Sequence, residues 1–574
     1  MVIAQGKPDV NGAEILRRME RDRAEGIRLS VFPEWALTGV LGAGEWLDTA
    51  LGVACDSWLE RIVAATAAGG AVLFGTACLW RGKRVGAVVA AENGAFVFPE
   101  DSPLMFVPKL PCGSDRFDAW TGGAAALSIA YGEGVSPERL FRPFRFTGLT
   151  VGAWCGGTPP DLDACYLSQG CNTLIQLRTT PYMRDRPPVY PACGTLPVLM
   201  CGGIGLVDAG KTVFALTGGT GWVYPDGKIR LAPTLREAAL DWGMGNGTVT
   251  PVDPAAPEQL FPVIESALGA YLRQLGLKRV VIGASGGIDS ALSAALYSRV
   301  VGDPGDLLLV NMPSRNNSKT TISLARQLAT AIGCNYTDIP IEESVALTLR
   351  QIEGRVCERL GGDAPGVRLS LSPLAIENVQ ARDRSGRILS ALSSAFGGVF
   401  TCNANKAECT IGYGTLYGDI SGFFAVLGDL WKREVWELAR FCNRSVFGRE
   451  VVPQGSIDIT PSAELSAQQN VDEGKGDPLV YPWHDRLFAA WTEREAPASL
   501  EDLQAWYRAG TLEREVGYDG DIRALFPTEE IFAADLARYW RLYHGLSRAK
   551  RLQAPPVLSL KSRTFGFDLG VAQM

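Results

Sequence analysis

A short turn rich in glycine and serine, residues 285–290, constrains the fold of this chain more than any other feature. Its sequence, Ser-Gly-Gly-Ile-Asp-Ser, follows the apolar, β-branched run 279–284 and precedes the small, helix-favouring residues 291–296. The pattern predicts a buried strand, a tight turn and a helix in succession. Further along, residues 306–310 predict a second buried strand and residues 320–332 a second helix. This alternation indicates an α/β fold with a doubly wound parallel sheet.

The turn also has the chemistry of a pyrophosphate cradle. Gly286 and Gly287 allow the backbone to approach a ligand closely, and the start of the helix offers free N–H groups and the positive end of a dipole. Ser285 and Ser290 add hydroxyl donors, while Asp289 adds a carboxylate suited to Mg²⁺. The turn is not a Walker A loop, because no Gly-Lys-Ser/Thr follows it. The alternative is a turn whose glycines serve packing alone.

The ordered motif resembles the PP-loop of the ATP pyrophosphatases. The resemblance implies that ATP is a substrate, bound with Mg²⁺ and cleaved to AMP and pyrophosphate while a carbonyl oxygen is activated as an adenylate. Several amide-forming synthetases share this loop, so it indicates the type of reaction and leaves the substrate open.

Length and composition limit the remaining possibilities. A chain of 574 residues is too long for one core, and the proline-rich stretch 251–259 predicts a linker between two domains. The net charge of −7 argues against general nucleic-acid binding. Thirteen scattered cysteines, no signal-peptide pattern and no membrane-length apolar run favour the reducing cytoplasm and no membrane partner. His484 and His544 are the only histidines, which excludes a Ser-His-Asp or Cys-His site in the first half.

Three reactive side chains in the first half each stand at the end of a predicted strand. These are Glu34 after residues 29–32, Lys109 after residues 104–107, and Cys155 after residues 149–154. We expect them to gather at one edge of a sheet, where ligands usually bind. Cys155 would attack an amide carbonyl, Glu34 would carry the proton to the leaving ammonia, and Lys109 would stabilise the oxyanion with the N–H of Gly156. Taken singly, each residue also suits a structural or surface role.

The first half, residues 1–250, resembles the nitrilase or carbon–nitrogen hydrolase family, and residues 32–39 (Phe-Pro-Glu-Trp-Ala-Leu-Thr-Gly) look like its general-base motif. The resemblance implies an αββα sandwich and a glutamine amidohydrolase domain. Where that family usually carries an acidic residue after its cysteine, this chain has Gly156-Gly157.

The second half, residues 260–574, carries polar blocks at 377–382, 403–408, 412–419 and 428–433 that suit a polar, anionic nucleotide. Together with the nitrilase-like half they resemble the glutamine-dependent NAD⁺ synthetases, which are carbon–nitrogen ligases, and we expect a homo-oligomer. That resemblance implies adenylation of deamido-NAD by ATP, followed by displacement of AMP by ammonia from glutamine.

The same resemblance implies a role for each polar position. Phosphates of ATP would lie on the 285–290 turn and Lys432, with further nucleotide contact from Lys406. Magnesium would be held by Asp289 and Glu408. The deamido-NAD would be surrounded by Arg382, Asp419 and Lys550.

Other interpretations make different predictions. An asparagine synthetase needs an N-terminal cysteine, whereas Met1-Val2 opens this chain, and a GMP synthetase needs a histidine that the first half lacks. An ammonia-dependent NAD⁺ synthetase with a degenerate glutaminase domain is the main alternative, because of Gly156-Gly157. A nucleotide-binding regulator would bind ATP without releasing pyrophosphate.

Overall fold

The computed structural model describes residues 1–40, 48–80, 83–109, 137–157, 162–186, 189–191, 194–208, 210–232, 235, 256–361 and 365–565. The chain divides into two compact units, Met1–Pro254 and Ala255–Met574. The division falls inside the stretch 251–259 where the sequence indicated a linker, of which residues 251–255 lie outside the described residues. In the described part of the chain, no helix combines the length and the apolar character needed to cross a membrane.

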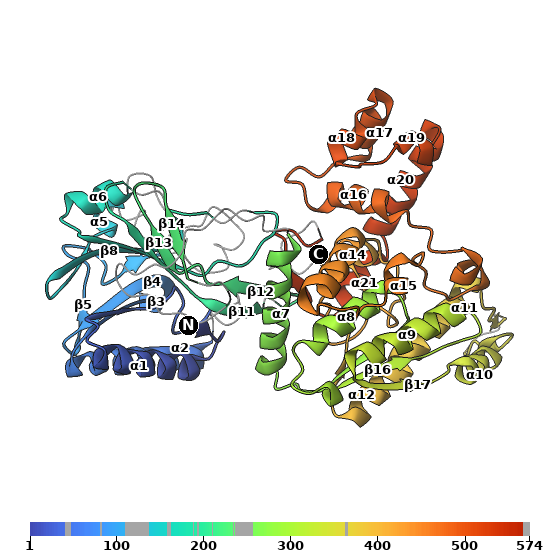
Figure 1. Cartoon of the computed structure of the whole chain (residues 1–574), viewed down its shortest axis with the longest axis horizontal. Coiled ribbons are helices and arrows are strands. Elements are labelled where there is room, and N and C mark those ends of the chain that lie inside the picture. The colour runs from blue at the N-terminus through green and yellow to red at the C-terminus, as the bar shows by residue number, and fades with distance from the viewer. Residues whose placement is uncertain are drawn as a thin grey trace. The chain divides into compact units, whose positions relative to one another are not determined.

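The first unit has two large sheets with helices on their outer faces (Figure 1), and β1, β11 and β12 pair in that order in a further sheet. One sheet has the order β2-β3-β4-β5, with β6 paired to β4, and the other has the order β14-β13-β10-β9-β8-β7. Helices α1 and α2 pack together along the first sheet, and α6 lies against the second through Tyr166, whose hydroxyl donates to the Ala153 carbonyl at 2.8 Å. The layering is the helix–sheet–sheet–helix order expected from the sequence.

The elements of this unit have the following bounds. The strands are β1 (Val2–Ile3), β2 (Leu29–Val31), β3 (Ala71–Trp80), β4 (Lys83–Glu92), β5 (Ala95–Val97), β6 (Val107–Pro108), β7 (Phe144–Phe146), β8 (Leu149–Cys155), β9 (Thr173–Arg178), β10 (Val198–Gly202), β11 (Ile204–Asp208), β12 (Thr212–Thr217), β13 (Gly221–Val223) and β14 (Ile229–Leu231). The helices are α1 (Pro8–Ala24), α2 (Thr49–Ala65), α5 (Pro137–Leu140) and α6 (Leu162–Ser168).

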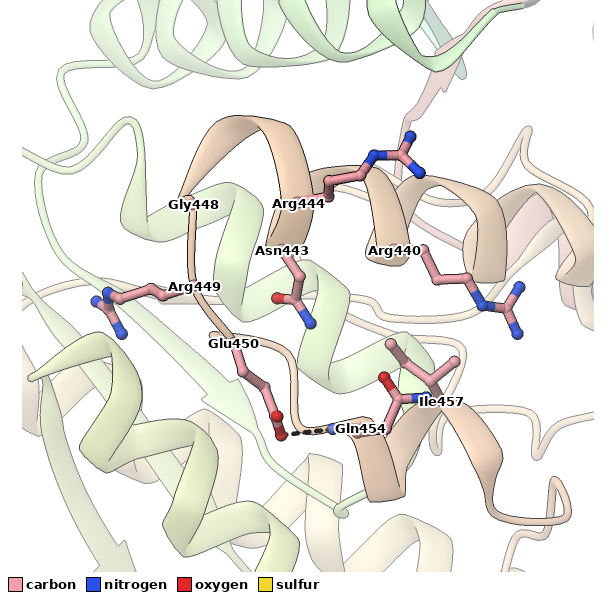
Figure 2. Close-up of a pocket in the computed structure, with 8 residues that line it drawn as sticks. All are labelled: Arg440, Asn443, Arg444, Gly448, Arg449, Glu450, Gln454 and Ile457. Carbon is pink, nitrogen blue, oxygen red and sulfur yellow. Dashed lines mark hydrogen bonds between the residues drawn. The ribbon is translucent and has the colours of Figure 1, made fainter.

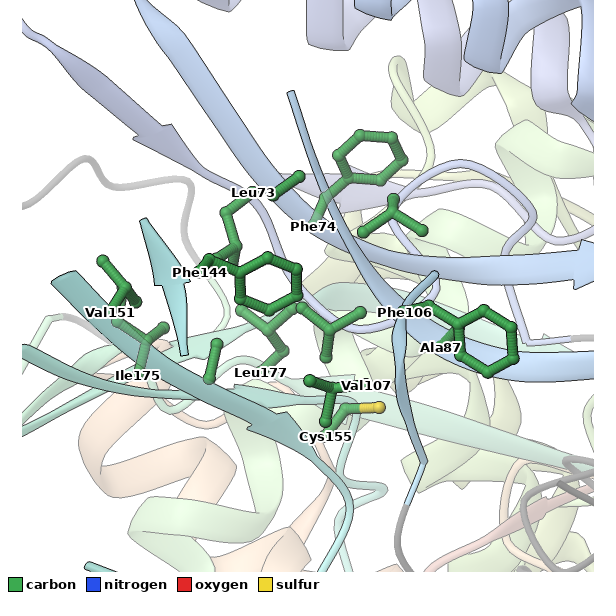
Figure 3. Packing of buried hydrophobic residues seen from close by; sticks show 14 of the residues in the cluster. Leu73, Phe74, Ala87, Phe106, Val107, Phe144, Val151, Cys155, Ile175 and Leu177 are labelled. Carbon is green, nitrogen blue, oxygen red and sulfur yellow. The ribbon is translucent and has the colours of Figure 1, made fainter. Parts of the chain in front are cut away.

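One hydrophobic core fills the space between the two sheets. Leu73 of β3, Val107 of β6 and Ile175 of β9 are fully buried in it, and Figure 3 shows them as part of one packed cluster. Both sheets contribute near-continuous apolar runs because each is covered on one side by the other sheet and on the other side by helices. Cys155, the last residue of β8, belongs to this core.

The second unit is built on a parallel sheet of order β17-β16-β15-β20. Its strands are β15 (Val280–Gly283), β16 (Leu307–Asn311), β17 (Asn335–Asp338) and β20 (Val399–Phe400), and the connecting helices include α8 (Ile288–Ser298), α9 (Lys319–Ile332), α12 (Ser390–Phe396), α13 (Lys406–Ile411) and α14 (Lys432–Phe441). Chain order reverses between β15 and β20, so the edge beyond β15 is a switch point where ligands bind in such sheets. The predicted doubly wound α/β class is therefore confirmed.

A helical lobe with an aromatic core completes this unit. Trp483, Phe488, Phe532 and Tyr539 are fully buried in it, and their rings lie in tilted or edge-on contact. Its helices are α16 (Tyr481–Thr492), α17 (Leu500–Ala509), α18 (Leu512–Val516), α19 (Ile522–Leu525) and α20 (Glu529–His544), and the chain then continues into α21 (Ser547–Gln553) and β21 (Val557–Ser559).

Candidate active sites

A buried ion pair joins two of the three residues predicted for the first unit. Lys109 Nζ lies 2.7 Å from Glu34 Oε1, and the two side chains are only 1% and 3% exposed. Glu34 follows β2 as predicted. Lys109 follows β6, which pairs with β4 over only two residues, although the sequence predicted a strand over 104–107. Removing two charges from water is costly unless each compensates the other. At this depth, each of the two side chains therefore depends on the other to balance its charge.

Cys155 stands at the same core. It ends β8, is 1% exposed, and packs in the cluster that contains Val107, two residues before Lys109 (Figure 3). The next residue, Gly156, has a φ of +85° and its carbonyl accepts from Gln176 Nε2 at 2.9 Å. The left-handed backbone there turns the chain sharply behind the cysteine, and a glycine adopts that conformation without strain.

Thr179 is a residue of this site that the motif analysis did not assign. Its hydroxyl donates to the Glu34 carbonyl at 2.8 Å, and both residues are buried. Thr179 follows directly on β9, and β9 pairs with β8 so that Leu177 lies opposite Cys155. The strand β9, which pairs with the strand of the cysteine, therefore also fixes the backbone of Glu34, a link that only the tertiary structure reveals.

The PP-loop, residues 285–290, connects β15 to α8 in the second unit as predicted. Ser285 Oγ and Ser290 Oγ lie 3.2 Å apart, the N–H of Gly287 donates to Ser285 Oγ at 3.2 Å, and Ser290 Oγ donates to the Gly287 carbonyl at 3.0 Å. Gly286 has a φ of +86°, and a Cβ there would lie 2.1 Å from the Thr321 carbonyl oxygen of α9. The loop is thus pre-shaped by its own hydroxyls and by close packing on α9.

Asp289 is held from two sides. Lys432, at the start of α14, forms an ion pair with its Oδ2, and Asn405 donates to its Oδ1 at 3.2 Å. Burial opposes the charge of Lys432, but Asp289 and Glu408 outweigh burial and raise the pKa of the ammonium above its ordinary value. Lys432 is therefore charged at neutral pH and is paired with Asp289 of the PP-loop.

Glu408 lies near Asp289 in α13. Burial, reinforced by the negative charges of Asp289 and Asp477, raises the pKa of Glu408 well above its ordinary value. Neighbouring carboxylates of this kind favour a cation between them. Mg²⁺ in nucleotide sites is held by one or two carboxylates together with phosphates and water, so the donor set of Asp289 and Glu408 fits that ion. Among the described residues, no group of three or more His, Cys, Asp or Glu side chains is arranged around a metal position.

Lys406 belongs to a buried cluster of charged side chains. Its ammonium is fully buried, 2.6 Å from Asp429 Oδ1 and 2.8 Å from Glu493 Oε1, and 5.0 Å from the centre of the Trp431 ring. Lys561 Nζ reaches the same Glu493 oxygen at 2.6 Å. Lys406 was predicted to contact the nucleotide, but this geometry places its charge in a buried ion cluster that ties α13 to α16.

The three residues predicted for the dinucleotide gather around the loop 412–419. Arg382 Nε donates to the Leu416 carbonyl at 3.1 Å, the N–H of Thr415 donates to Asp419 Oδ1 at 2.6 Å, and Lys550 Nζ donates to the Gly412 carbonyl at 2.7 Å. Burial lowers the pKa of Lys550 and the nearby Asp419 charge opposes that effect. The structure thus brings together residues from three distant parts of the sequence.

Asp477 and Glu464 were not assigned a role from the sequence. Tyr413 donates to Asp477 Oδ1 at 2.8 Å, beside Glu408. Glu464 accepts from the N–H of Ser318 at 3.1 Å and from Thr321 Oγ1 at 2.7 Å. It therefore caps the start of α9, the helix on which the PP-loop packs.

An open cleft of about 320 Å³ lies near the end of α14 and α15 (Gln454–Asp458). It is lined by Arg440, Asn443, Arg444, Gly448, Arg449, Glu450, Gln454 and Ile457. Figure 2 shows its three arginine side chains pointing in different directions, so the guanidinium groups do not converge on one ligand. We assign no ligand to this cleft.

Comparison with known proteins identifies the family of this chain. The family model described as NAD synthase matches residues 260–504. A glutamine-dependent NAD(+) synthetase of Rhodobacter capsulatus is 31% identical over 435 residues, which cover 71% of this chain and 70% of the relative. The chain belongs to the glutamine-dependent NAD(+) synthetase family. The family expected from the motifs is thereby confirmed.

Further relatives agree in sequence and in fold. A glutamine-dependent NAD(+) synthetase of Thermotoga maritima is 36% identical over 242 residues, covering 42% of this chain and 39% of the relative. The solved structure of the Cytophaga hutchinsonii synthetase matches with a TM-score of 0.69 at 14% identity, covering 100% of this chain and 97% of that one. The Acinetobacter baumannii synthetase, solved in complex with ADP, matches with a TM-score of 0.62 at 19% identity, covering 100% and 98%. These likenesses support the two-unit α/β fold.

Proposed function

We propose that this chain makes NAD⁺ from deamido-NAD, ATP and glutamine, releasing AMP, pyrophosphate and glutamate. The observation that carries the glutamine half is the buried Glu34–Lys109 ion pair at the core that contains Cys155. Family membership and the PP-loop support the synthetase half.

The first unit would release ammonia from glutamine. Cys155 attacks the side-chain carboxamide while Glu34 accepts the thiol proton and passes it to the departing ammonia. Lys109 stabilises the negative charge that develops on the carbonyl oxygen, and its own charge is neutralised in the resting state by Glu34. Water then hydrolyses the thioester, with Glu34 as the base, and glutamate leaves.

The second unit would use that ammonia. The N–H groups and hydroxyls of the PP-loop bind the phosphates of ATP at the start of α8. The nicotinate carboxylate attacks the α-phosphate, pyrophosphate leaves, and Lys432 stabilises the charge that accumulates between the two. Ammonia adds to the resulting adenylate and displaces AMP.

Magnesium would be held by Asp289 and Glu408, and it would neutralise phosphate charge when it is bound. The deamido-NAD would lie against the loop 412–419 with Arg382, Asp419 and Lys550 around it. Lys406, sequestered in its ion cluster, would support this region from within the protein.

The test is the Cys155→Ala variant assayed with each nitrogen source. We expect glutamine-driven NAD⁺ formation to fall at least about 1,000-fold, because the nucleophile is gone. Turnover with ammonium should stay within about twofold of the wild type. If the unsubstituted chain turns over with ammonium and not with glutamine, the first unit is a degenerate glutaminase and the ammonia-dependent alternative holds. ATP binding without pyrophosphate release would contradict both.

Homo-oligomeric assembly stays a prediction from the family resemblance. Light scattering of the purified chain measures it directly, and a mass above the 61.6 kDa of one chain is expected.

A further inference from the structure

Trp35, directly after Glu34, has an unusual backbone conformation. Its φ is +57°, in the left-handed region, and its side chain is 1% exposed. A bulky aromatic residue is rarely found there, because its Cβ crowds the neighbouring carbonyl. Such a conformation persists only when the surrounding structure forces it, and it occurs often at functional sites.

Two glycines on neighbouring strands make room for it. In the antiparallel pair of β3 and β4, Gly86 lies opposite Ala77, and Ala77 is two residues from Gly75. Gly75 and Gly86 therefore share one face of the sheet. A Cβ on Gly75 would lie 2.6 Å from Glu34 Cα, and a Cβ on Gly86 would lie 2.6 Å from Trp35 Cη2.

Gly75 also holds the ends of this turn. Its N–H donates to the Pro33 carbonyl at 3.1 Å, and its carbonyl accepts from the N–H of Ala36 at 2.9 Å. The two hydrogen bonds enclose Glu34 and Trp35, so the turn cannot shift along β3 without breaking one of them.

Gly86 is the point where the supports of both charged residues meet. Its carbonyl accepts from the N–H of Lys109 at 2.9 Å, and its missing Cβ would also lie 3.1 Å from Lys109 Cβ. The same face of Gly86 therefore contacts both the Trp35 ring, next to Glu34, and the side chain of Lys109. The distance between Glu34 and Lys109 therefore depends on the close approach that a glycine at position 86 allows.

We propose that Trp35, seated on Gly75 and Gly86, is a positioning residue that sets the geometry of Glu34 and Lys109 for glutamine hydrolysis. The inference rests on the proposed glutaminase function. Trp35 is buried and acts through its neighbours, and a displacement of about 1 Å at reacting groups can cost 100-fold in rate. A change in the packing of Trp35 should therefore lower kcat for glutamine and leave the KM for glutamine and the ammonium-driven reaction unchanged.

The test pairs Gly86→Ala with Trp35→Phe, since phenylalanine lacks the Cη2 and Cζ2 atoms that the new methyl group would meet. In the wild-type background, Gly86→Ala should lower kcat for glutamine about 100-fold, with KM within about threefold. Trp35→Phe alone should lower kcat about tenfold by opening a gap. In the Trp35→Phe background, Gly86→Ala should be much less harmful, because its methyl group enters that gap and only the 3.1 Å approach to Lys109 Cβ remains.

Gly12→Ala is the matched control. A Cβ on Gly12 would lie 2.4 Å from the Trp58 ring, a similar collision of a glycine with a tryptophan between α1 and α2. It should lower the melting temperature without lowering kcat for glutamine. If Gly86→Ala and Gly12→Ala affect kcat equally, or if Gly86→Ala is as harmful in the Trp35→Phe background as in the wild type, the proposal is wrong. If Gly86→Ala alone fails to fold, comparing the double variant with Trp35→Phe decides the question. Full glutamine turnover in Cys155→Ala would instead overturn the proposed function.

Discussion

Individual hydrogen bonds help to fix the position of the proposed catalytic residues of this protein. Thr179 is the clearest case, because its one side-chain donor holds the carbonyl of the proposed base, Glu34. Replacing it with valine keeps the shape and removes that hydrogen bond from the buried carbonyl, which costs about 1–3 kcal/mol.

We expect Thr179→Val to lower kcat for glutamine roughly tenfold and to leave ammonium-driven NAD⁺ formation unchanged. Steady-state assays with the two nitrogen sources measure the difference. Thr180→Val, on the exposed neighbour, is the control and should behave as wild type. An equal loss with both nitrogen sources would show that Thr179 supports the fold and not the glutaminase site.

Asp485 is a single residue that makes the stability of the protein depend on pH. It is fully buried, its Oδ2 accepts from the N–H of Arg433 at 3.0 Å, and burial raises its pKa to about 7. Because the folded state holds the proton more tightly than the unfolded state, this group's contribution to stability is complete below about pH 4 and is lost as the pH rises through 7.

The Asp485→Asn variant should lack this loss, so its advantage over wild type should grow by a few kcal/mol between pH 4 and pH 7, at about 1.4 kcal/mol per pKa unit. Denaturant unfolding at a series of pH values gives the two curves. Asp519→Asn, on a side chain that is 98% exposed, should run parallel to wild type. Parallel curves for Asp485→Asn would mean that its carboxyl ionises normally in the folded state.

At the scale of elements, the PP-loop depends on the distance between β15, α8 and α9. Gly286→Ala would place a methyl group 2.1 Å from the Thr321 carbonyl oxygen, in a backbone conformation that alanine rarely adopts. We expect pyrophosphate release to fall more than about 100-fold with either nitrogen source, because the loop must move away from its phosphate-binding shape. Glutamate release from glutamine should remain measurable.

Gly276→Ala separates the effect of the left-handed backbone conformation from the effect of the close contact with α9. Its φ is +68°, but its Cβ would have nothing within 4 Å. It should cost about 1 kcal/mol of stability and no activity. Normal pyrophosphate release by Gly286→Ala would show that the loop tolerates displacement from α9.

Much of the element-level structure could be predicted. The PP-loop, the helix closed by Gly333 in its left-handed conformation, and the strands ending near Glu34 and Cys155 follow from local patterns. Lys406 could not be placed in this way, because a lysine beside Asn405 in a polar block looks the same whether it faces a nucleotide or Asp429 and Glu493. Its partners lie 23 and 87 residues away.

At the scale of the whole molecule, one chain carries both the proposed source of ammonia and its consumer. We predict that ammonia passes from Cys155 to the adenylate without release into solution. An ammonia-scavenging enzyme should therefore abolish NAD⁺ formation from added ammonium and leave glutamine-driven formation within about twofold. Equal suppression of both reactions would show that the ammonia is released before it is used.

The sequence by itself determined the α/β class, the family and the chemistry of the reactive groups, because these depend on local periodicity and on motifs with fixed spacing. The tertiary structure alone decided which of those groups meet. The Glu34–Lys109 pair, the seat of Trp35 on two glycines, and the burial of Lys406 in an ion cluster all depend on close approaches between residues far apart in the chain. Such contacts are set by packing and by the cost of burying charge, and neither leaves a local pattern in the sequence.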